Sequence, residues 1–191
     1  MQYKLTTPCT AEDLAPLKAG DTVLLSGVVY TARDQAHKRM LEALDKGEKL
    51  PFDLEGSAIY YVGPTPERPG EVIGSAGPTT SGRMDAMSPR LLDLGNKIMI
   101  GKGKRDAAVK EAVVRNGAVY LAALGGAGAL MAQSVKTLEV IAWPDLGCEA
   151  VRRLTVEDMP LTVILDAHGG DLYLSGPAAY KRQQGEGAKE L

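Results

Sequence analysis

Two strands and a helix are encoded in residues 97–124, KIMIGKGKRDAAVKEAVVRNGAVYLAAL. The apolar run at 97–100 predicts a buried strand, and a helix is expected over residues 106–115, where the pair Asn116-Gly117 is a typical helix end. The apolar run at 118–124 predicts the next strand. Because strand and helix alternate, the segment favours an α/β architecture with parallel strand pairs.

The same alternation extends toward the N-terminus. Residues 21–30 have the β-branched and aliphatic composition of a strand, and an apolar stripe predicts a helix from there to about residue 49. Thr31, followed three residues later by Asp34, resembles a capping box, so the helix is expected to begin there. Further strands are predicted at residues 57–62, 72–76, 138–143 and 161–165, with the last forming a hairpin with residues 171–174.

The remaining segments complete one domain. A turn and short helix are expected at residues 125–133, and Ser88-Pro89 leaves open whether the chain after residue 77 forms one bent helix or two short ones. Residues 181–191 have almost no apolar side chains and are expected to be a helix end or a flexible tail. The length of 191 residues and the 45% hydrophobic content predict a single globular domain over residues 1–191.

Composition excludes several function classes. A formal net charge of −2 gives no general attraction to nucleic acid or to an anionic membrane. Cys9 and Cys148 stand outside any Cys-x-x-Cys spacing, so they predict neither a disulfide framework nor a zinc site, and they fit a reducing cytoplasm. No apolar run approaches the roughly 20 residues of a membrane span, and the first residues lack the apolar core of a signal peptide. A cytoplasmic protein is expected.

Basic residues follow three of the predicted strands. Arg33, Arg83 and Lys102 each come shortly after a strand, and Lys104 and Arg105 follow Lys102. Because the carboxyl ends of parallel strands face one crevice, these loops are expected to converge on a cationic pocket. Each residue alone is typical of a solvated loop, but three together favour an anion site. Two arginine forks and a lysine are sufficient to hold a dicarboxylate.

Three hydroxyl side chains lie in the segment at residues 77–85, GPTTSGRMD. Gly77-Pro78 breaks the preceding strand, and the next residues can open a helix whose free backbone N–H groups point at a carboxylate or phosphate. Thr79, Thr80 and Ser81 would then lie within reach of that ligand. Helix capping explains each hydroxyl equally well.

Three further residues are candidates for supporting contacts around this site. His37 lies four residues after Arg33 on the same helix face, which makes it either a partner of the site or a partly buried polar residue. Thr80 and Asp85 flank the hydroxyls and Arg83 in the same segment. No metal site is predicted in the chain.

Several segments together resemble the β subunits of class I iron–sulfur fumarases and of the related L-tartrate dehydratases. The segments that carry the resemblance are GPTTSGRMD at 77–85, ARDQAHKR at 32–39, LPFDLEG at 50–56 and GKGKR at 101–105. The resemblance covers almost the whole chain and becomes looser from residue 151. It implies a swivelling β/β/α domain, with a mixed sheet and flanking helices.

The resemblance also implies site roles. Arg33, Arg83 and Lys102 would bind the substrate carboxylates, and Thr79 is the candidate base, in the reversible hydration of fumarate to (S)-malate. The [4Fe-4S] cluster that this chemistry uses would be held by a cysteine-bearing α subunit, because the two cysteines here are too few for a cluster held by three thiolates. A hetero-oligomer is therefore expected, active only as a complex.

Two alternatives stay open. One is the β subunit of an L-tartrate dehydratase, and the other is a non-catalytic module that binds a dicarboxylate. Residues 157–160 and 166–173 look more like the fumarase version. Tyr60, Tyr61 and the proline-rich loop at 63–70 are candidates for the surface that meets a partner.

Overall fold

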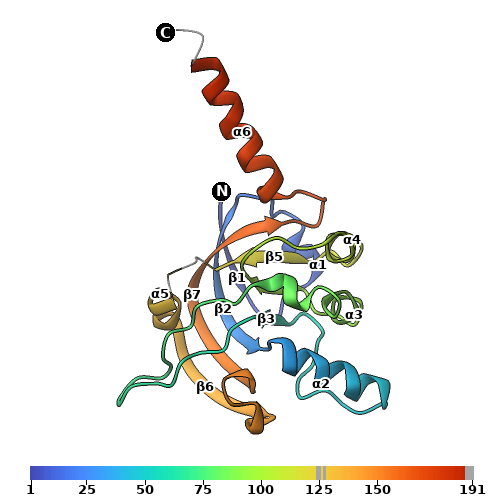
Figure 1. Ribbon diagram of the computed structural model, residues 1–191, viewed down its shortest axis with the longest axis vertical. Helices are drawn as coiled ribbons and strands as arrows, with labels where there is room; N and C mark the ends of the chain where they lie inside the picture. Colours follow the sequence, from blue (N-terminus) through green and yellow to red (C-terminus); the bar gives the residue numbers. More distant parts are fainter. Residues whose placement is uncertain (124–125, 127, 188–191) are drawn as a thin grey trace.

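A curved sheet with helices on its outer face forms the body of the molecule (Figure 1). The computed structural model describes residues 1–123, 126 and 128–187. None of the helices in these ranges is both long enough and apolar enough to cross a membrane.

Strand pairing closes part of the sheet into a ring. Parallel pairs run from β2 (Thr22–Thr31) through β3 (Ala58–Tyr60) and β4 (Ile98–Gly101) to β5 (Val119–Ala122). The long strand β7 (Val151–Leu165) is antiparallel to both β5 and β2 and therefore joins the two ends of this series. Two further strands extend the sheet: β1 (Gln2–Thr6) parallel to β2, and β6 (Val135–Ala142) antiparallel to β7.

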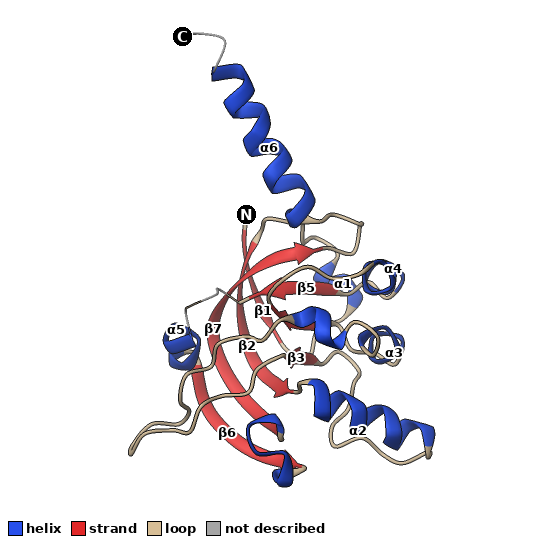
Figure 2. Ribbon diagram, viewed as in Figure 1, coloured by secondary structure: helices blue, strands red, loops and turns tan. Residues whose placement is uncertain are grey.

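Helices flank the ring, as the colouring in Figure 2 shows. Their bounds are α1 (Ala11–Leu14), α2 (Asp34–Asp45), the 3-10 turn η1 (Ser81–Met84), α3 (Ser88–Asp93), α4 (Ala107–Arg115), α5 (Gly128–Gln133), the 3-10 turn η2 (Pro144–Glu149) and α6 (Leu172–Gly187). α2, α3 and α4 lie side by side against β3 and β4, whereas α6 extends away from the body.

The pleat of the strands divides the apolar side chains between two cores. Tyr60, Ile100 and Leu121 belong to the core inside the ring, while their neighbours Ile59 and Met99 pack in the core beneath the helices. Successive side chains of a strand point to opposite faces, so one short strand supplies both cores. The carboxyl ends of β2, β3 and β4 are thereby held rigidly from both sides.

The predicted α/β architecture, with a mixed sheet and flanking helices, is confirmed. The strand–helix–strand unit at 97–124 appears as β4, α4 and β5. Asp106 caps α4 by accepting a hydrogen bond from Val109 N, and Gly117 adopts a φ of +58° just after it. The chain after residue 77 forms two short helices, η1 and α3. Residues 181–187 continue α6, and residues 124, 125, 127 and 188–191 lie outside the described residues.

The prediction of a strand at 72–76 is wrong. Ser75 exchanges hydrogen bonds with Thr65, whose amide donates to Ser75 O at 3.1 Å and whose Oγ1 accepts from Ser75 N at 2.8 Å. The segment therefore folds back onto the preceding loop instead of joining the sheet. Arg83 accordingly follows a loop rather than a strand.

Two other local predictions are wrong. Thr31 remains in β2, where its hydroxyl donates to Ala150 O at 3.2 Å, so Arg33 rather than Thr31 stands at the N-cap of α2. The hairpin expected after residue 165 reduces to a single bridge between Leu165 and Asp171, because α6 begins at Leu172. A hydroxyl that finds a partner on a distant strand is not free to cap a helix.

Candidate active site

The segment with the hydroxyl side chains lies between the ends of β3 and β4. Thr79 N donates to Tyr61 O at 2.8 Å, just beyond β3. Thr80 forms a parallel bridge with Lys102, just beyond β4, and Ser81 N donates to Lys102 O at 2.9 Å. Thr79 and Thr80 therefore lie close to Lys102 in the chain fold.

The expected cradle of free backbone N–H groups is not what this segment offers. The amides of Thr79 and Ser81 are already used in hydrogen bonds to Tyr61 and Lys102, and η1 is a single 3-10 turn. These two amides are therefore not available to an anion. Thr80 and Lys102 are exposed and Thr79 is half-buried.

Arg83 is tied to the start of α2 by an acidic residue that the sequence analysis named only as part of a capping box. Asp34, the first residue of α2, forms an ion pair with Arg83 Nη2, and Arg33 precedes it at the N-cap. The Arg33 side chain passes close to Gly63, where an added Cβ would lie 2.6 Å from Nη1. Since Val62 is bridged to Pro78, Arg33 lies near the start of the hydroxyl segment.

A second acidic residue, Glu149, pairs with Arg33. Glu149 Oε1 lies 3.5 Å from Arg33 Nη2, and its Oε2 accepts a hydrogen bond from Gln35 N at 2.9 Å. η2, which carries Glu149, is fixed to α2 by two hydrogen bonds from Arg39 to Asp145. Asp34 was expected only as the acid of a capping box, and no local signal links Glu149 to a residue 114 positions earlier.

Buried polar atoms gather in the first turn of α2. Arg33 Nε, Asp34 Oδ1 and His37 Nε2 are buried and have no hydrogen-bond partner within the described chain. His37 is fully buried, and its Nδ1 lies 2.9 Å from the Arg33 carbonyl oxygen. A carbonyl only accepts, so Nδ1 carries the proton and Nε2 presents a lone pair. Burial lowers the pKa of His37 to about 4, which keeps the imidazole neutral.

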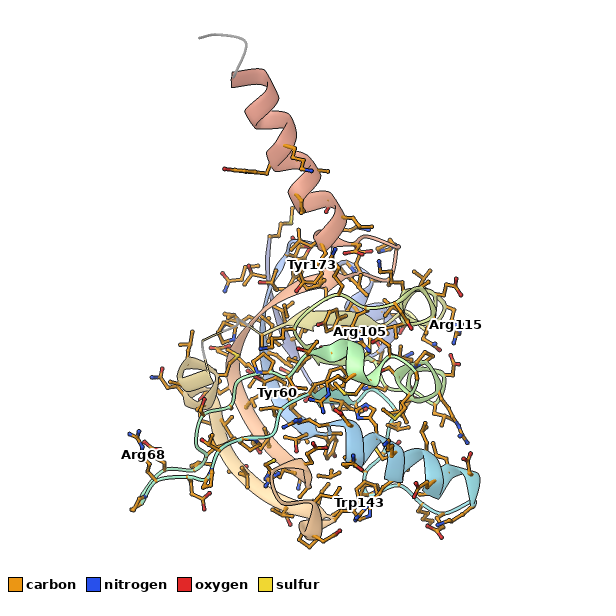
Figure 3. All side chains as sticks on the ribbon, viewed as in Figure 1. Tyr60, Arg68, Arg105, Arg115, Trp143 and Tyr173 are labelled. Carbon is orange, nitrogen blue, oxygen red and sulfur yellow. The ribbon has the colours of Figure 1, made fainter. Side chains whose placement is uncertain are left out.

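Asp85 and Arg105 form a buried pair beneath the site. Arg105 Nε donates to Asp85 Oδ1 at 2.5 Å, and Asp106 N donates to Asp85 Oδ2 at 2.8 Å. The guanidinium lies between the rings of Tyr61 and Tyr120, at 5.3 and 5.0 Å from their centres. Arg105 thus points into the body rather than into the pocket with Lys102, whereas Arg115 lies at the surface (Figure 3).

The two tyrosines expected at a partner surface are interior residues. Tyr60 and Tyr61 are both buried, and Tyr60 donates to Ala76 O. The loop that follows them does reach the surface, with Arg68 at its tip (Figure 3).

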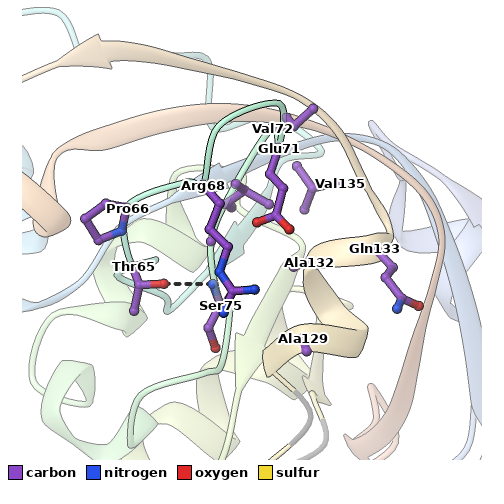
Figure 4. Close-up of a pocket in the computed structure, with 12 residues that line it drawn as sticks. Thr65, Pro66, Arg68, Glu71, Val72, Ser75, Ala129, Ala132, Gln133 and Val135 are labelled. Carbon is purple, nitrogen blue, oxygen red and sulfur yellow. Dashed lines mark hydrogen bonds between the residues drawn. The ribbon is translucent and has the colours of Figure 1, made fainter.

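Two cavities lie beside this loop, and neither is lined by the cations of the candidate site. One of about 460 Å³ lies between the loop and α5 (Figure 4), and the other, of about 450 Å³, lies between the loop and β6. None of Arg33, Thr79, Arg83 and Lys102 lines either cavity. The candidate site is therefore separate from these two cavities.

The cysteines do not fit an iron–sulfur cluster. Cys9 is buried, and desolvation, helped by the charge of Asp13, raises the pKa of its thiol to about 11. Cys148 is exposed, and the described residues contain no group of three or more His, Cys, Asp and Glu side chains able to hold a metal ion. Two cysteines cannot supply the three thiolates that a cluster with one open iron requires.

Comparison with known proteins decides the family. Residues 1–176 match the family described as "Fumarase C-terminus". The chain belongs to this family.

The relatives within this family fall into two sizes. Fumarate hydratase 2 of Leishmania major is 39% identical over 168 residues, which cover 85% of this chain but 29% of that enzyme. The L(+)-tartrate dehydratase subunit beta of Escherichia coli K12 is 34% identical over 177 residues, covering 90% of this chain and 87% of that subunit. A Methanocaldococcus jannaschii protein, provisionally named as a subunit of the same kind, is 43% identical over 86% of this chain and 87% of its own length. The chain thus spans less than a third of the length of the fumarate hydratases that it matches.

Proposed function

We propose that this chain is the β subunit of an iron–sulfur hydro-lyase that interconverts fumarate and (S)-malate. The observation that carries the proposal is the placement of the Thr79–Ser81 segment beside Lys102 at neighbouring strand ends, with Arg83 paired to Asp34, the residue that follows Arg33. The family and the names of its members supply the reaction class. We propose that the whole reaction needs a second protein segment, because this chain matches less than a third of the fumarate hydratases and its two cysteines are too few for the cluster.

The cations are proposed to bind the two carboxylates of the substrate. Arg33 and Arg83 each keep donors free beyond their contacts with Glu149 and Asp34, since a guanidinium has five N–H groups. Each can therefore hold a substrate carboxylate while the internal acid fixes its orientation. Lys102, exposed beside Thr80, adds a point charge at the hydroxyl end of the site.

Thr79 is proposed to accept the proton in the dehydration direction. Loss of water from malate removes a proton from C3 and hydroxide from C2, so one group must take the proton and another must receive the hydroxide. A threonine hydroxyl is a very weak acid, and it acts as a base only if a nearby cation stabilises its alkoxide. Lys102, whose backbone is bridged to the neighbouring Thr80, is proposed to be that cation.

The [4Fe-4S] cluster is proposed to belong to a cysteine-bearing α subunit, since the thiols of this chain do not fit it. The working protein is then a hetero-oligomer of the reducing cytoplasm. Residues 1–191 are proposed to fold as one domain of that assembly.

L-tartrate is the second candidate substrate. The relatives that match this chain over most of their own length are named as tartrate dehydratase β subunits, whereas the named fumarate hydratases are far longer chains. Both substrates are 2-hydroxy dicarboxylates or their dehydration products, so the same three cations suit either.

The first test is anaerobic co-purification of the chain with its native partner, followed by assays of iron, sulfide and the dehydration of malate and tartrate. A cluster-bearing complex that dehydrates malate supports the fumarase assignment, and preference for tartrate selects the second candidate. Recovery of the chain alone, without iron but with tight dicarboxylate binding, would replace both with a non-catalytic binding module.

The role of Thr79 is tested in the same complex. We expect Thr79→Ser to retain turnover and Thr79→Val to lower kcat by about 100-fold or more with little change in substrate binding. An equal loss of binding in Thr79→Val would make the hydroxyl a positioning group.

A further inference from the structure

A buried serine joins the hydroxyl segment to the loop after β4. Ser81 is fully buried, and its Oγ accepts a hydrogen bond from Lys102 N at 3.0 Å. Its own amide donates to Lys102 O at 2.9 Å. Ser81 therefore bonds to both the donor and the acceptor of the Lys102 main chain, once through its backbone and once through its side chain.

The hydroxyl of Tyr120, on β5, completes this connection from below. It lies 2.9 Å from Ser81 Oγ and 3.0 Å from Gly103 O. Tyr120 is fully buried, and desolvation raises the pKa of its hydroxyl above the ordinary value, so it stays neutral and keeps its proton. One interior side chain thus touches the first residue of η1 and the loop after β4 at the same time.

Gly101 allows this close approach. A Cβ at Gly101 would lie 1.9 Å from Ser81 Oγ and 3.0 Å from the Tyr61 ring. Real Cβ atoms do not approach other atoms so closely, so any larger residue at Gly101 would displace Ser81.

We infer that Ser81 and Tyr120 form a clamp that fixes Thr79 and Thr80 relative to Lys102. The two threonines lie between two anchors: Thr79 N bonded to Tyr61 O, and Ser81 bonded to Lys102. Both clamp residues are interior and do not reach the open surface, so they are positioning residues. The catalytic part of this inference rests on the proposed function, whereas the structural part does not.

Small displacements of reacting groups have large kinetic effects, because effective alignment supplies much of the rate. Tyr120→Phe and Ser81→Ala should therefore lower kcat about 10- to 100-fold in the complete complex. KM should stay within about threefold, since Arg33 and Arg83 are untouched. If the two residues act as one unit, the double variant should be no slower than the slower single variant.

Thr7→Val is the matched control. The Thr7 hydroxyl is also largely buried, and it donates to Val28 O at 2.7 Å at the far end of β1. Its loss should reduce the stability of the complex by a comparable amount and leave kcat unchanged. If kcat falls equally in Thr7→Val, general destabilisation explains the effect of the clamp variants, and the inference is overturned.

Amide hydrogen exchange in the full chain tests the clamp without any assay of activity. In Tyr120→Phe and Ser81→Ala the amides of Thr79, Ser81 and Lys102 should exchange at least about tenfold faster, while the amides of β2 keep their rates. Unchanged exchange at all three amides overturns the clamp. Faster exchange with unchanged kcat overturns the catalytic role of the clamp. A wild-type complex that turns over neither malate nor tartrate refutes the proposed function, but the exchange test of the clamp still holds.

Discussion

Two groups of buried polar side chains flank the candidate site, and they differ in how fully they are hydrogen-bonded. The first, here called the paired layer, consists of Ser81, Asp85, Ser88, Arg105 and Tyr120 beneath β4 and β5. It is joined by contacts such as Arg105 Nη2 to Ser88 Oγ at 2.9 Å and Ser88 Oγ to Met84 O at 2.9 Å. The second, here called the α2 turn, consists of Arg33, Asp34 and His37, each with one buried atom that has no partner in the described chain.

This difference indicates that the two groups have different roles. A buried polar atom without a partner costs about 1–3 kcal/mol, whereas a satisfied network adds rigidity. The paired layer therefore serves as the support that aligns the strand-end loops. The α2 turn gives up stability at the place where Arg33 and Arg83 are presented, as is common where residues are selected for binding rather than for folding.

The largest expected effect is the loss of the central ion pair in the paired layer. Asp85→Asn leaves the fully buried Arg105 without its counter-charge, so we expect the free energy of unfolding to fall by about 3–5 kcal/mol. Urea unfolding of the purified chain measures this change.

The same substitution in the α2 turn is the matched comparison. Asp34 also pairs with an arginine, but Arg83 is half-exposed and water can take over its solvation. Asp34→Asn should therefore change the unfolding free energy by about 1 kcal/mol or less. Equal losses in the two variants would abolish the distinction between the paired layer and the α2 turn.

The second prediction concerns acid stability. His37 titrates near 6.5 when unfolded but has a folded pKa of about 4. Between these values the unfolded state binds the extra proton, so stability should fall as the pH is lowered from about 6.5 toward 4, by on the order of 3 kcal/mol. His37→Phe, which preserves the edge-on ring contact with Tyr61, should remove this part of the pH dependence.

Unfolding curves from pH 7 to pH 4.5 provide the measurement. His168 is present in both proteins, so the difference between their slopes reports His37. Identical slopes would mean that His37 takes up its proton over the same pH range in the folded protein as in the unfolded chain. The α2 turn would then be less buried than its geometry indicates.

The sequence predicted best what local patterns determine. β4, α4 and β5 follow from apolar runs, from Asp106 as a cap and from Gly117 as a stop. The positions of Arg33 and Lys102 followed from one topological rule, that parallel strands share an edge at their carboxyl ends. Their family motifs pointed to the same residues. Their binding roles are still predictions.

The features that the sequence did not predict depend on contacts between residues that are far apart in the chain. β7 pairs with β2 across more than a hundred residues, and the exposed face of β7 carries charged residues such as Arg153 and Glu157 that conceal its strand character. The same long-range closure brings Glu149 to Arg33 and gives the Thr31 hydroxyl a partner at Ala150. Residues 72–76 are the reverse case, because an apolar run there folds back on its own loop through Ser75 and Thr65 instead of joining the sheet.

The smallest predicted effect concerns the acid that holds Arg33. Glu149→Gln keeps an oxygen to accept from Gln35 N, so the position of η2 should not change. It removes a negative charge 3.5 Å from Arg33 Nη2, and a partly exposed pair of this kind is worth about 1 kcal/mol or less. An incoming carboxylate then no longer competes with an internal one, so KM for the dicarboxylate should fall about two- to fivefold with kcat nearly unchanged. Steady-state kinetics of the complex at two salt concentrations measures this, since the gain should shrink as screening increases. A rise in KM would show instead that Glu149 is needed to orient Arg33. Glu149 would then support the site, as the paired layer does.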